Sequence, residues 1–182
     1  MSWGAEQGHD RVVSLRALAH PVRLQMLSLL TGAPMSAAEV ARELGLTHAN
    51  ASYHLRNLLA AGMITQAGEE RIRGGIAKRY RYDADRDRER DREVLKSRDP
   101  HTHQALFAAV ANELTRRVDE ADWSVTSTMT DAELWVDPEV WRDVRARITQ
   151  ASRDLHDAAQ APRTPGAVRT STTIAMFQLE ES

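Results

Sequence analysis

Apolar residues recur at helical spacing along the first part of the chain. Residues 10–19 follow this spacing until His20 and Pro21 interrupt it, and Pro21 fits the first position of a new helix. Residues 22–30 are apolar on most sides, which predicts a helix at the centre of the core. A glycine, an alanine and a proline at 32–34 end this helix.

Two short amphipathic helices follow, joined by a tight turn. Ser36 and Glu39 have the spacing of a capping box, in which each side chain bonds to the backbone of the other residue. Gly45 fits the end of this first helix, because it turns left-handed without a Cβ clash. Two helices joined by such a turn predict a helix-turn-helix arrangement, in which the second helix meets the DNA.

Residues 47–61 are the predicted DNA-recognition helix. Thr47 suits the N-cap, where its hydroxyl can bond to the first turn, and Gly62 suits the position after the end. The predicted inner stripe is Ala51, Leu55, Leu58 and Leu59. The opposite face carries no acid, as expected of a surface that approaches phosphates. Its residues are Ala49, Asn50, Ser52, Tyr53, Arg56 and Asn57.

The exposed face of this helix supplies the predicted DNA contacts. Asn50 is the best candidate to read an adenine, because its amide can bond to that base edge in two places. His54 projects about 60° from the inner stripe, so we expect a half-buried residue that faces phosphate rather than a catalytic acid or base. The predicted contacts from this helix are His48, Asn50, Ser52, Tyr53, His54, Arg56 and Asn57.

A hairpin follows the recognition helix. Residues 63–68 and 78–82 have strand character, and the segment between them, 69–77, is predicted to be a flexible tip. Over 65–82 the hairpin forms a basic wing that would reach flanking phosphates or the minor groove, with a solvated surface hairpin as the alternative. Its cations are Arg71, Arg73, Lys78, Arg79 and Arg81, of which the first four are predicted DNA contacts.

Charge divides the chain into a basic part and an acidic part. Residues 11–82 carry ten Arg or Lys and four Asp or Glu, whereas residues 83–182 carry fourteen basic and twenty acidic residues. This asymmetry predicts that only the first part meets a polyanion. It argues against the alternative function, a winged-helix protein–protein adaptor without DNA binding, in which the acidic part would dock a partner protein.

The combined spacing of these residues resembles that of the ArsR-like winged helix-turn-helix regulators. The resemblance covers about residues 11–82 and rests on the segments 18–30, 44–46, 52–55, 59–64 and 75–82. It implies a dimeric transcription factor, usually a repressor, that a ligand or another signal releases from DNA. Ala49, Ala51 and Tyr53 depart from the residues common in that family, so the operator sequence does not carry over.

Residues 85–122 are predicted to hold a charged linker followed by a dimerisation helix. Positive and negative residues alternate over 85–93, which is typical of a solvated linker or an exposed helix. Apolar residues then recur at helical spacing over about 103–120, where such regulators commonly place their dimer interface, and packing against the same domain is the alternative. The predicted dimer contacts are Leu106, Phe107, Val110, Leu114 and Val118.

The last third, residues 123–182, is predicted to be a small strand–helix–strand unit. Residues 123–136 and 168–179 are rich in residue types that favour strands. Between them, an Asp-Pro pair at 137–138 begins an amphipathic helix that extends to about residue 159. The unit has little core, so we expect it to pack on the preceding helix or on a second subunit. Its expected core, with a ligand pocket as the alternative, is Trp123, Trp135 and Trp141.

No residue pattern in the sequence supports a catalytic or metal centre. The absence of cysteine excludes disulfides and thiolate metal sites. Asp99 and His101 match the start of the carboxylate–imidazole motif of metal-sensing members of the family, but Asn112 and Thr115 stand where its second half needs ligands. No nucleophile–histidine–acid spacing, phosphate loop or nucleotide-binding glycine pattern occurs. We therefore expect no enzyme activity, metal or cofactor.

The predicted fold is α+β and mainly helical. A flexible arm, 1–10, precedes a winged helix-turn-helix domain over 11–84, followed by the dimerisation helix and the C-terminal unit. No apolar run is long enough to cross a membrane, and the N-terminus lacks the apolar core of a signal peptide, so we expect a cytoplasmic protein. The predicted function is a homodimeric transcriptional regulator, a repressor that reads a palindrome in double-stranded DNA, with an unknown small molecule as a candidate effector.

Overall fold

The computed structural model of the protein describes residues 18–72, 75–82 and 100–180. Several predictions lie outside these residues: the N-terminal arm, most of the helix over 10–19, the wing residue Arg73 and the alternating charges of the linker. The described elements are α2 (Pro21–Gly32), β1 (Met35–Ser36), α3 (Ala37–Leu44), α4 (His48–Ala60), β2 (Ile64–Ile72), β3 (Gly75–Tyr82), α6 (Pro100–Asp119) and α7 (Pro138–Asp157).

Local capping signals fix the ends of the helix-turn-helix pair, α3 and α4. The Ser36 hydroxyl accepts a hydrogen bond from the Glu39 backbone N–H, and the Glu39 carboxylate accepts one from the Ser36 N–H at 2.7 Å. Gly45 ends α3 with a φ of 64°, in the left-handed region. The Thr47 hydroxyl accepts a hydrogen bond from the Asn50 N–H at 3.2 Å. The predicted capping box and both predicted caps are confirmed.

The sheet has three antiparallel strands in the order β1-β3-β2. Met35 pairs with Tyr80, and the hairpin pairs Ile64 with Tyr82 at its base and Ile72 with Gly75 at its end. The predicted hairpin is confirmed, but its strands are longer than predicted, so residues 69–72 and 75–77 belong to the strands and not to a flexible tip. The sequence did not predict β1, because two residues are too short to produce an alternating pattern.

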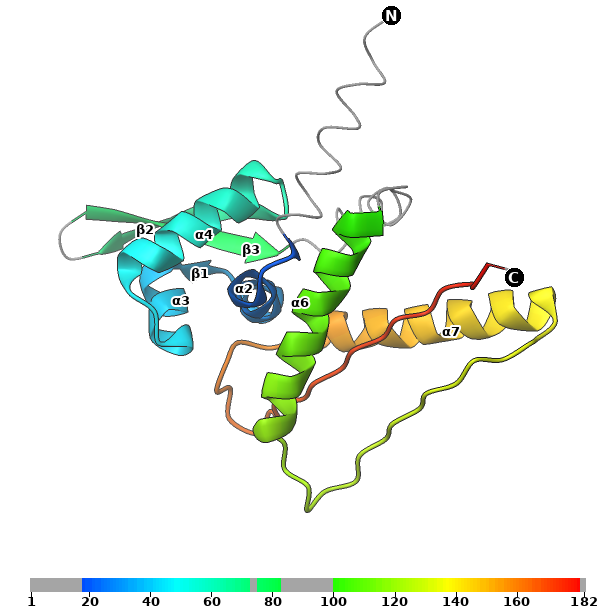
Figure 1. The fold of residues 1–182 in the computed structure, drawn as a ribbon. Coiled ribbons are helices and arrows are strands. Elements are labelled where there is room, and N and C mark those ends of the chain that lie inside the picture. The colour runs from blue at the N-terminus through cyan, green and yellow to red at the C-terminus, as the bar shows by residue number, and fades with distance from the viewer. Residues whose placement is uncertain (1–17, 73–74, 83–99, 181–182) are drawn as a thin grey trace, which may run out of the picture.

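The core lies where α2, α3, α4 and the base of the sheet meet, and α2 lies between this layer and α6 (Figure 1). In α4, Leu59 was predicted to lie in the buried face but is exposed, and His54 lies in that face in its place. At 100° per residue the buried stripe is centred between Leu55 and His54, which leaves Leu59 about 90° away. The core residues are Met26, Leu27, Leu30, Met35, Val40, Ala41, Ala51, Leu55, Leu58, Met63, Ile64 and Tyr80.

Helix α6 divides the five predicted dimer contacts between two faces. Leu106 is buried and Val110 half-buried, and both pack towards Leu18 beside α2. The other three residues share a stripe that follows helical spacing and lies open to solvent in the single chain. These exposed residues are Phe107, Leu114 and Val118. The alternative of packing against the same domain therefore applies to the first face alone.

A buried carboxylate joins α6 to α2. Glu113 is only 2% exposed and accepts a hydrogen bond from the Gln25 amide nitrogen at 2.8 Å. Arg116 and Arg117 donate to the same carboxylate from within α6. Burial raises the pKa of Glu113, but the hydrogen bonds from Arg116, Gln25 and Arg117 outweigh it and lower the pKa below its ordinary value. The ionised Glu113 is thus fully partnered and fixes α6 on the domain.

The C-terminal third contains the predicted helix but neither predicted strand. Asp137 caps α7 by accepting hydrogen bonds from the backbone N–H groups of Glu139 and Val140. Residues 123–136 and 168–179, by contrast, are irregular. They have strand-forming side chains but no backbone partner among the described residues, and a strand needs a neighbour to pair with.

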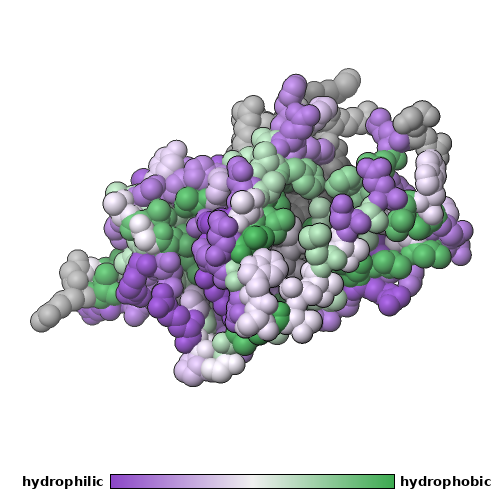
Figure 2. All heavy atoms as spheres, turned by 60° about the horizontal axis from the view of Figure 1, so that its bottom comes forward, coloured by the Kyte–Doolittle hydropathy of each residue, from purple (hydrophilic) through white to green (hydrophobic). Residues whose placement is uncertain are grey.

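The three tryptophans of this region do not form the predicted core. Trp123 is 66% exposed and Trp135 is 92% exposed, and only Trp141 is half-buried. No residue of α7 is buried. Figure 2 shows hydrophobic residues at the surface on the right-hand end of the molecule, where α7 and the segment before it lie. The predicted core is wrong because these side chains find too few neighbours within one chain.

The end of α2 makes a close approach to the loop after α7. A Cβ atom placed on Gly32 would lie 2.0 Å from the backbone oxygen of Gln160. We expect Gly32→Ala to push residues 160–161 off α2 while α2 itself gains helix propensity. Limited digestion with trypsin should then cleave after Arg163 several-fold faster than in the unchanged protein. Ser28→Ala, on the exposed side of the same helix, is the control, and equal rates for all three proteins would contradict the prediction.

Candidate nucleic-acid interface

The outer face of α4 presents polar side chains and no acid. His48, Asn50, Tyr53 and Arg56 are exposed, as predicted, and Tyr53 keeps 53% of its surface open. Ser52 and Asn57 flank them and are half-buried. The first turn of α4 contains no acidic residue, so its free N–H groups and the positive end of the helix dipole remain available to an anion. This face can therefore approach the backbone of a duplex.

His54 does not belong to this face. Its side chain is 6% exposed and its ring centroid lies 4.7 Å from that of His20 and 5.3 Å from that of Tyr53. The prediction of a phosphate-facing His54 is wrong, because the ring fills the junction between the start of α2 and α4. The spacing of 51, 54, 55 and 58 was the signal that could have placed it in the core.

The two adjacent imidazoles, whose ring planes are inclined by 51°, resist protonation. Burial and then the charge of Arg23 lower the pKa of His20 below its ordinary value of 6.5. Burial, followed by the charges of His20 and Arg23, lowers the pKa of His54 in the same way. Both rings are therefore neutral at pH 7, and protonating either would place a cation beside Arg23 under the recognition helix.

This junction should make stability fall in mild acid. A group whose pKa is lower in the folded chain binds more protons when unfolded, so its contribution is lost as the pH falls below about 6.5. We expect the free energy of unfolding, measured with urea, to decrease from pH 7.5 to pH 5.5. The decrease should be smaller in His54→Gln. His48→Gln, a change of the same kind at an exposed position, should keep the original pH dependence, and a change in its slope equal to that of His54→Gln would contradict the assignment.

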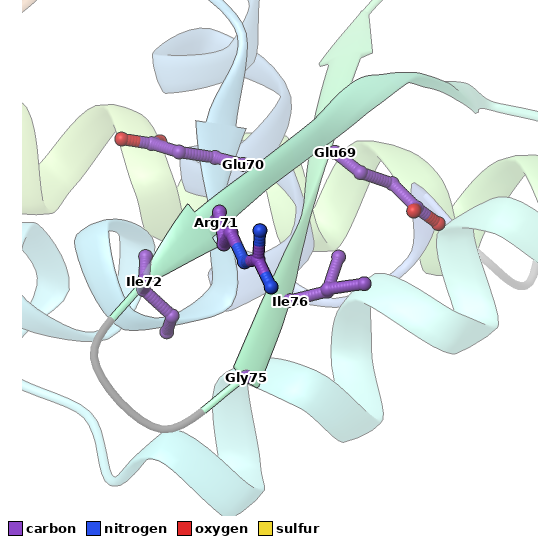
Figure 3. A pocket seen from close by; sticks show the side chains of 6 residues that line it. All are labelled: Glu69, Glu70, Arg71, Ile72, Gly75 and Ile76. Atoms are coloured by element: carbon purple, nitrogen blue, oxygen red, sulfur yellow. The ribbon is translucent and has the colours of Figure 1, made fainter.

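The wing carries exposed cations along its length. Arg71, Lys78 and Arg81 are exposed, and within the described part of the chain none of them forms an ion pair. Figure 3 shows Arg71 and Ile76, which are register partners, projecting on the same side of the hairpin. A hollow on this part of the wing is lined by Glu69, Glu70, Arg71, Ile72, Gly75 and Ile76. The wing thus offers cations and exposed apolar side chains together.

Arg79 serves the fold instead of the outer surface. Its guanidinium forms ion pairs with Glu39 of α3 and Glu70 of β2, and donates to the backbone oxygen of Pro34 at 2.5 Å. Burial raises the pKa of Glu39, but hydrogen bonds from Ser36 and the charge of Arg79 outweigh it and lower the pKa. The predicted DNA contact of Arg79 does not fit this geometry, because its donors already bind partners within the domain.

Arginine side chains form ion pairs with most of the acids in the domain. Glu39 and Glu70 pair with Arg79, and Glu43 pairs with Arg163 from the loop after α7 at 3.3 Å. Glu69 accepts a hydrogen bond from Gln66 at 3.2 Å and, within the described residues, has no cationic partner. Figure 3 shows that Glu69 and Glu70 leave β2 in opposite directions. Three of the four carboxylates near the basic surface are therefore paired with arginine.

Residues 18–67, which include α2, α3, α4 and the start of the wing, match the family described as a helix-turn-helix domain. These residues are a helix-turn-helix domain. No curated protein gives a significant match to the chain. Among solved structures the chain is similar to reduced HlyU from Vibrio cholerae N16961, at 20% identity and a TM-score of 0.37, over 54% of this chain and 100% of that chain.

The helix-turn-helix domain confirms the predicted α3–α4 arrangement and supports a DNA-binding transcription regulator. The ArsR-like subtype stays a prediction. In the described ranges no three potential metal ligands among His, Asp and Glu lie together. Within these ranges, too, no helix combines the length and apolar character needed to cross a bilayer.

Proposed function

We propose that this chain is a sequence-specific DNA-binding transcription regulator that acts as a homodimeric repressor. In this proposal α4 of the helix-turn-helix domain lies in the major groove and the wing lies over the adjacent backbone. The observation that carries the proposal is the outer face of α4, which is polar, exposed and free of carboxylates. The protein has no catalytic role in this account.

Different residues of α4 would contact the bases and the phosphates of the DNA. Asn50 stands in the first turn, next to where a recognition helix meets base edges, and its amide can form two hydrogen bonds with an adenine. Arg56 and Tyr53 are one or two turns further along and exposed, so they can reach either a base or a phosphate. His48, Ser52 and Asn57 would add contacts at the edges of the same face.

The wing would supply affinity that depends on salt. Arg71, Lys78 and Arg81 are the described cations without an ion pair, and Arg73 joins them by its place in the sequence. Each phosphate that they neutralise releases counterions from the duplex, so each should contribute about one to the slope of log affinity against log salt. These contacts would position the protein on DNA of any sequence.

A homodimer would allow the protein to read a palindrome. The open stripe of α6 formed by Phe107, Leu114 and Val118 supports association with a second copy, because exposed apolar stripes of this kind mark interaction surfaces. Two α4 helices about 34 Å apart would then meet successive major grooves on one side of the duplex. This spacing ties the dimer to the symmetry of its operator.

A small molecule is a reasonable signal for such a regulator. A hollow between α2, α6 and the last part of the chain contains Glu113 and Arg117, with an apolar wall formed by leucines and Val110. None of the three tryptophans that the sequence suggested as a ligand pocket lines it. A ligand there would touch the helix-turn-helix domain and the C-terminal third at once.

Selection of genomic fragments by the purified protein, followed by footprinting, tests the proposal. We expect recovered fragments to share a palindrome whose half-sites are centred one or two helical turns apart. Recovery of fragments with no shared sequence would overturn the sequence-specific role. Failure to retain DNA at low salt, together with retention of a partner protein, would favour the adaptor function.

A further inference from the structure

The C-terminal third has the side chains of a folded unit without the interior of one. Between residues 120 and 180 the single chain buries no side chain below 9% exposure. Yet this region holds exposed Trp, Val, Leu, Ile and Phe side chains that water does not favour. Ordering a segment costs conformational entropy that apolar burial normally offsets. A second copy of the chain could supply the missing burial.

Two stretches also leave their backbone unpaired. We call residues 123–136 the connecting segment and residues 168–179 the C-terminal segment. No backbone group of 125–136 or of the C-terminal segment bonds to another described backbone group. Each contains three Thr together with Val, residue types that favour strands. Local sequence preference and single-chain structure therefore disagree, and a pairing strand would reconcile them.

The two segments are held differently. The C-terminal segment is docked on α6: the Phe177 ring lies 5.9 Å from that of Phe107, and Arg169 pairs with Glu120 at 2.7 Å. The connecting segment instead lies away from the rest of the chain between the end of α6 and the start of α7 (Figure 1). Met129 and Trp135 within it are each 92% exposed. The C-terminal segment is thus fixed on the domain, and the connecting segment is open to a partner.

We propose that the connecting segment of one copy adds as a strand to the C-terminal segment of a second copy. Exposed strand edges pair readily with another chain, and exchange of identical elements gives a closed two-fold dimer. Each copy supplies one docked C-terminal segment and one open connecting segment, so in a dimer every segment would have a partner. The pairing would also be continuous with the open stripe of α6, because Phe107 contacts the C-terminal segment.

The area available is what a stable dimer requires. A fully covered aromatic side chain buries about 150–250 Å². Because Trp123, Trp135 and Phe177 are 66%, 92% and 61% exposed, covering the part that remains open would supply roughly half of the ~800 Å² per partner of an ordinary interface. The other half is within reach of the remaining exposed apolar side chains. These are Val125, Met129, Leu134, Val168 and Leu179.

Cysteine cross-linking tests the exchange, because the chain contains no cysteine of its own. Protein carrying Ser171→Cys is mixed with protein carrying Ala132→Cys, which would face it in a centred antiparallel pair, or Ser127→Cys, which would face it in a parallel pair. We expect one of the mixtures to give a disulfide-linked dimer on oxidation. A disulfide that forms only within one chain, when both cysteines are placed in it, would overturn the proposal.

Light scattering of the full chain and of two variants tests whether the connecting segment stabilises the dimer. We expect twice the chain mass of 20.4 kDa, and at least a tenfold weaker dimer for Trp135→Asp. Ile76→Asp, an equally drastic change at an exposed residue of the wing, should leave the mass unchanged. The inference rests on the proposed homodimer. If Trp135→Asp leaves the dimer unchanged and no cross-link forms, strand exchange alone would be overturned. If the unchanged protein is a monomer, the homodimer would be overturned as well.

Discussion

Affinity for the operator is expected to fall by roughly 100-fold or more when Arg56 is changed to glutamate. Arg56 is exposed on the outer face of α4, where a guanidinium can bind a base or a phosphate. Losing such a contact costs about 1–3 kcal/mol, and the new carboxylate adds repulsion from the DNA backbone. The two effects together reach about 3 kcal/mol, which is the free energy of a 100-fold change.

Fluorescence anisotropy with labelled operator DNA at fixed salt measures this effect. Arg147→Glu in α7 makes the same charge change at a residue that is 76% exposed and lies outside the proposed interface. It should lower affinity less than threefold. Arg56 forms no ion pair within the described chain, so its replacement should leave the urea midpoint unchanged. Equal losses of affinity in the two variants would mean that only net charge matters and would contradict the assignment of α4.

The helix-turn-helix pair could be predicted from the sequence because its signals are local. Ser36 and Glu39 are three residues apart and cap each other, and Thr47 and Gly45 act within one turn of their own positions. Hydrophobic spacing then indicates which side faces inward. Such signals do not depend on the fold of the rest of the chain, so the helix ends that they predict are also the helix ends in the folded domain.

The position of His54 and the role of Arg79 could not be predicted, because distant segments decide both. His54 is buried because His20 meets it from the start of α2. Arg79 turns inward because it bonds to Glu39 and Pro34. These residues lie some 40 positions earlier in the sequence, so local spacing does not reveal the contacts. A count of cations on the wing cannot separate Arg79 from Arg81, although Arg79 is half-buried and bound within the domain and Arg81 is exposed.

The C-terminal third shows the opposite failure. Its sequence predicts strands over 123–136 and 168–179 from residue preference, but a strand forms only where another strand supplies hydrogen bonds. The described residues supply no such backbone partner to either segment. Preference for a conformation and the presence of a partner are separate conditions, and sequence reports only the first. The strand prediction fails for one chain and, under strand exchange, would hold for two.

Replacing Arg79 by methionine is expected to destabilise the domain by about 2 kcal/mol and to weaken DNA binding indirectly. Methionine keeps the apolar stem but leaves Glu39 and Glu70 as like charges near each other, and the Pro34 oxygen without its donor. Loss of hydrogen bonds to charged groups typically costs 1–3 kcal/mol, and partial exposure of this site keeps the cost in that range. Because Arg79 joins β3 to α3 and β2, the wing should lose its fixed position beside α4.

Arg81→Met separates this role from contact with DNA. Arg81 is two residues along β3 and exposed, so its replacement should keep the urea midpoint and reduce the slope of log affinity against log salt by about one. Arg79→Met should do the reverse: it should lower the midpoint while the slope changes little. Arg79→Lys should restore only part of the stability, since an ammonium cannot bind both carboxylates and a carbonyl as a planar guanidinium does. A reduced salt slope with an unchanged midpoint in Arg79→Met would return Arg79 to the DNA surface, where counting charges along the sequence had put it.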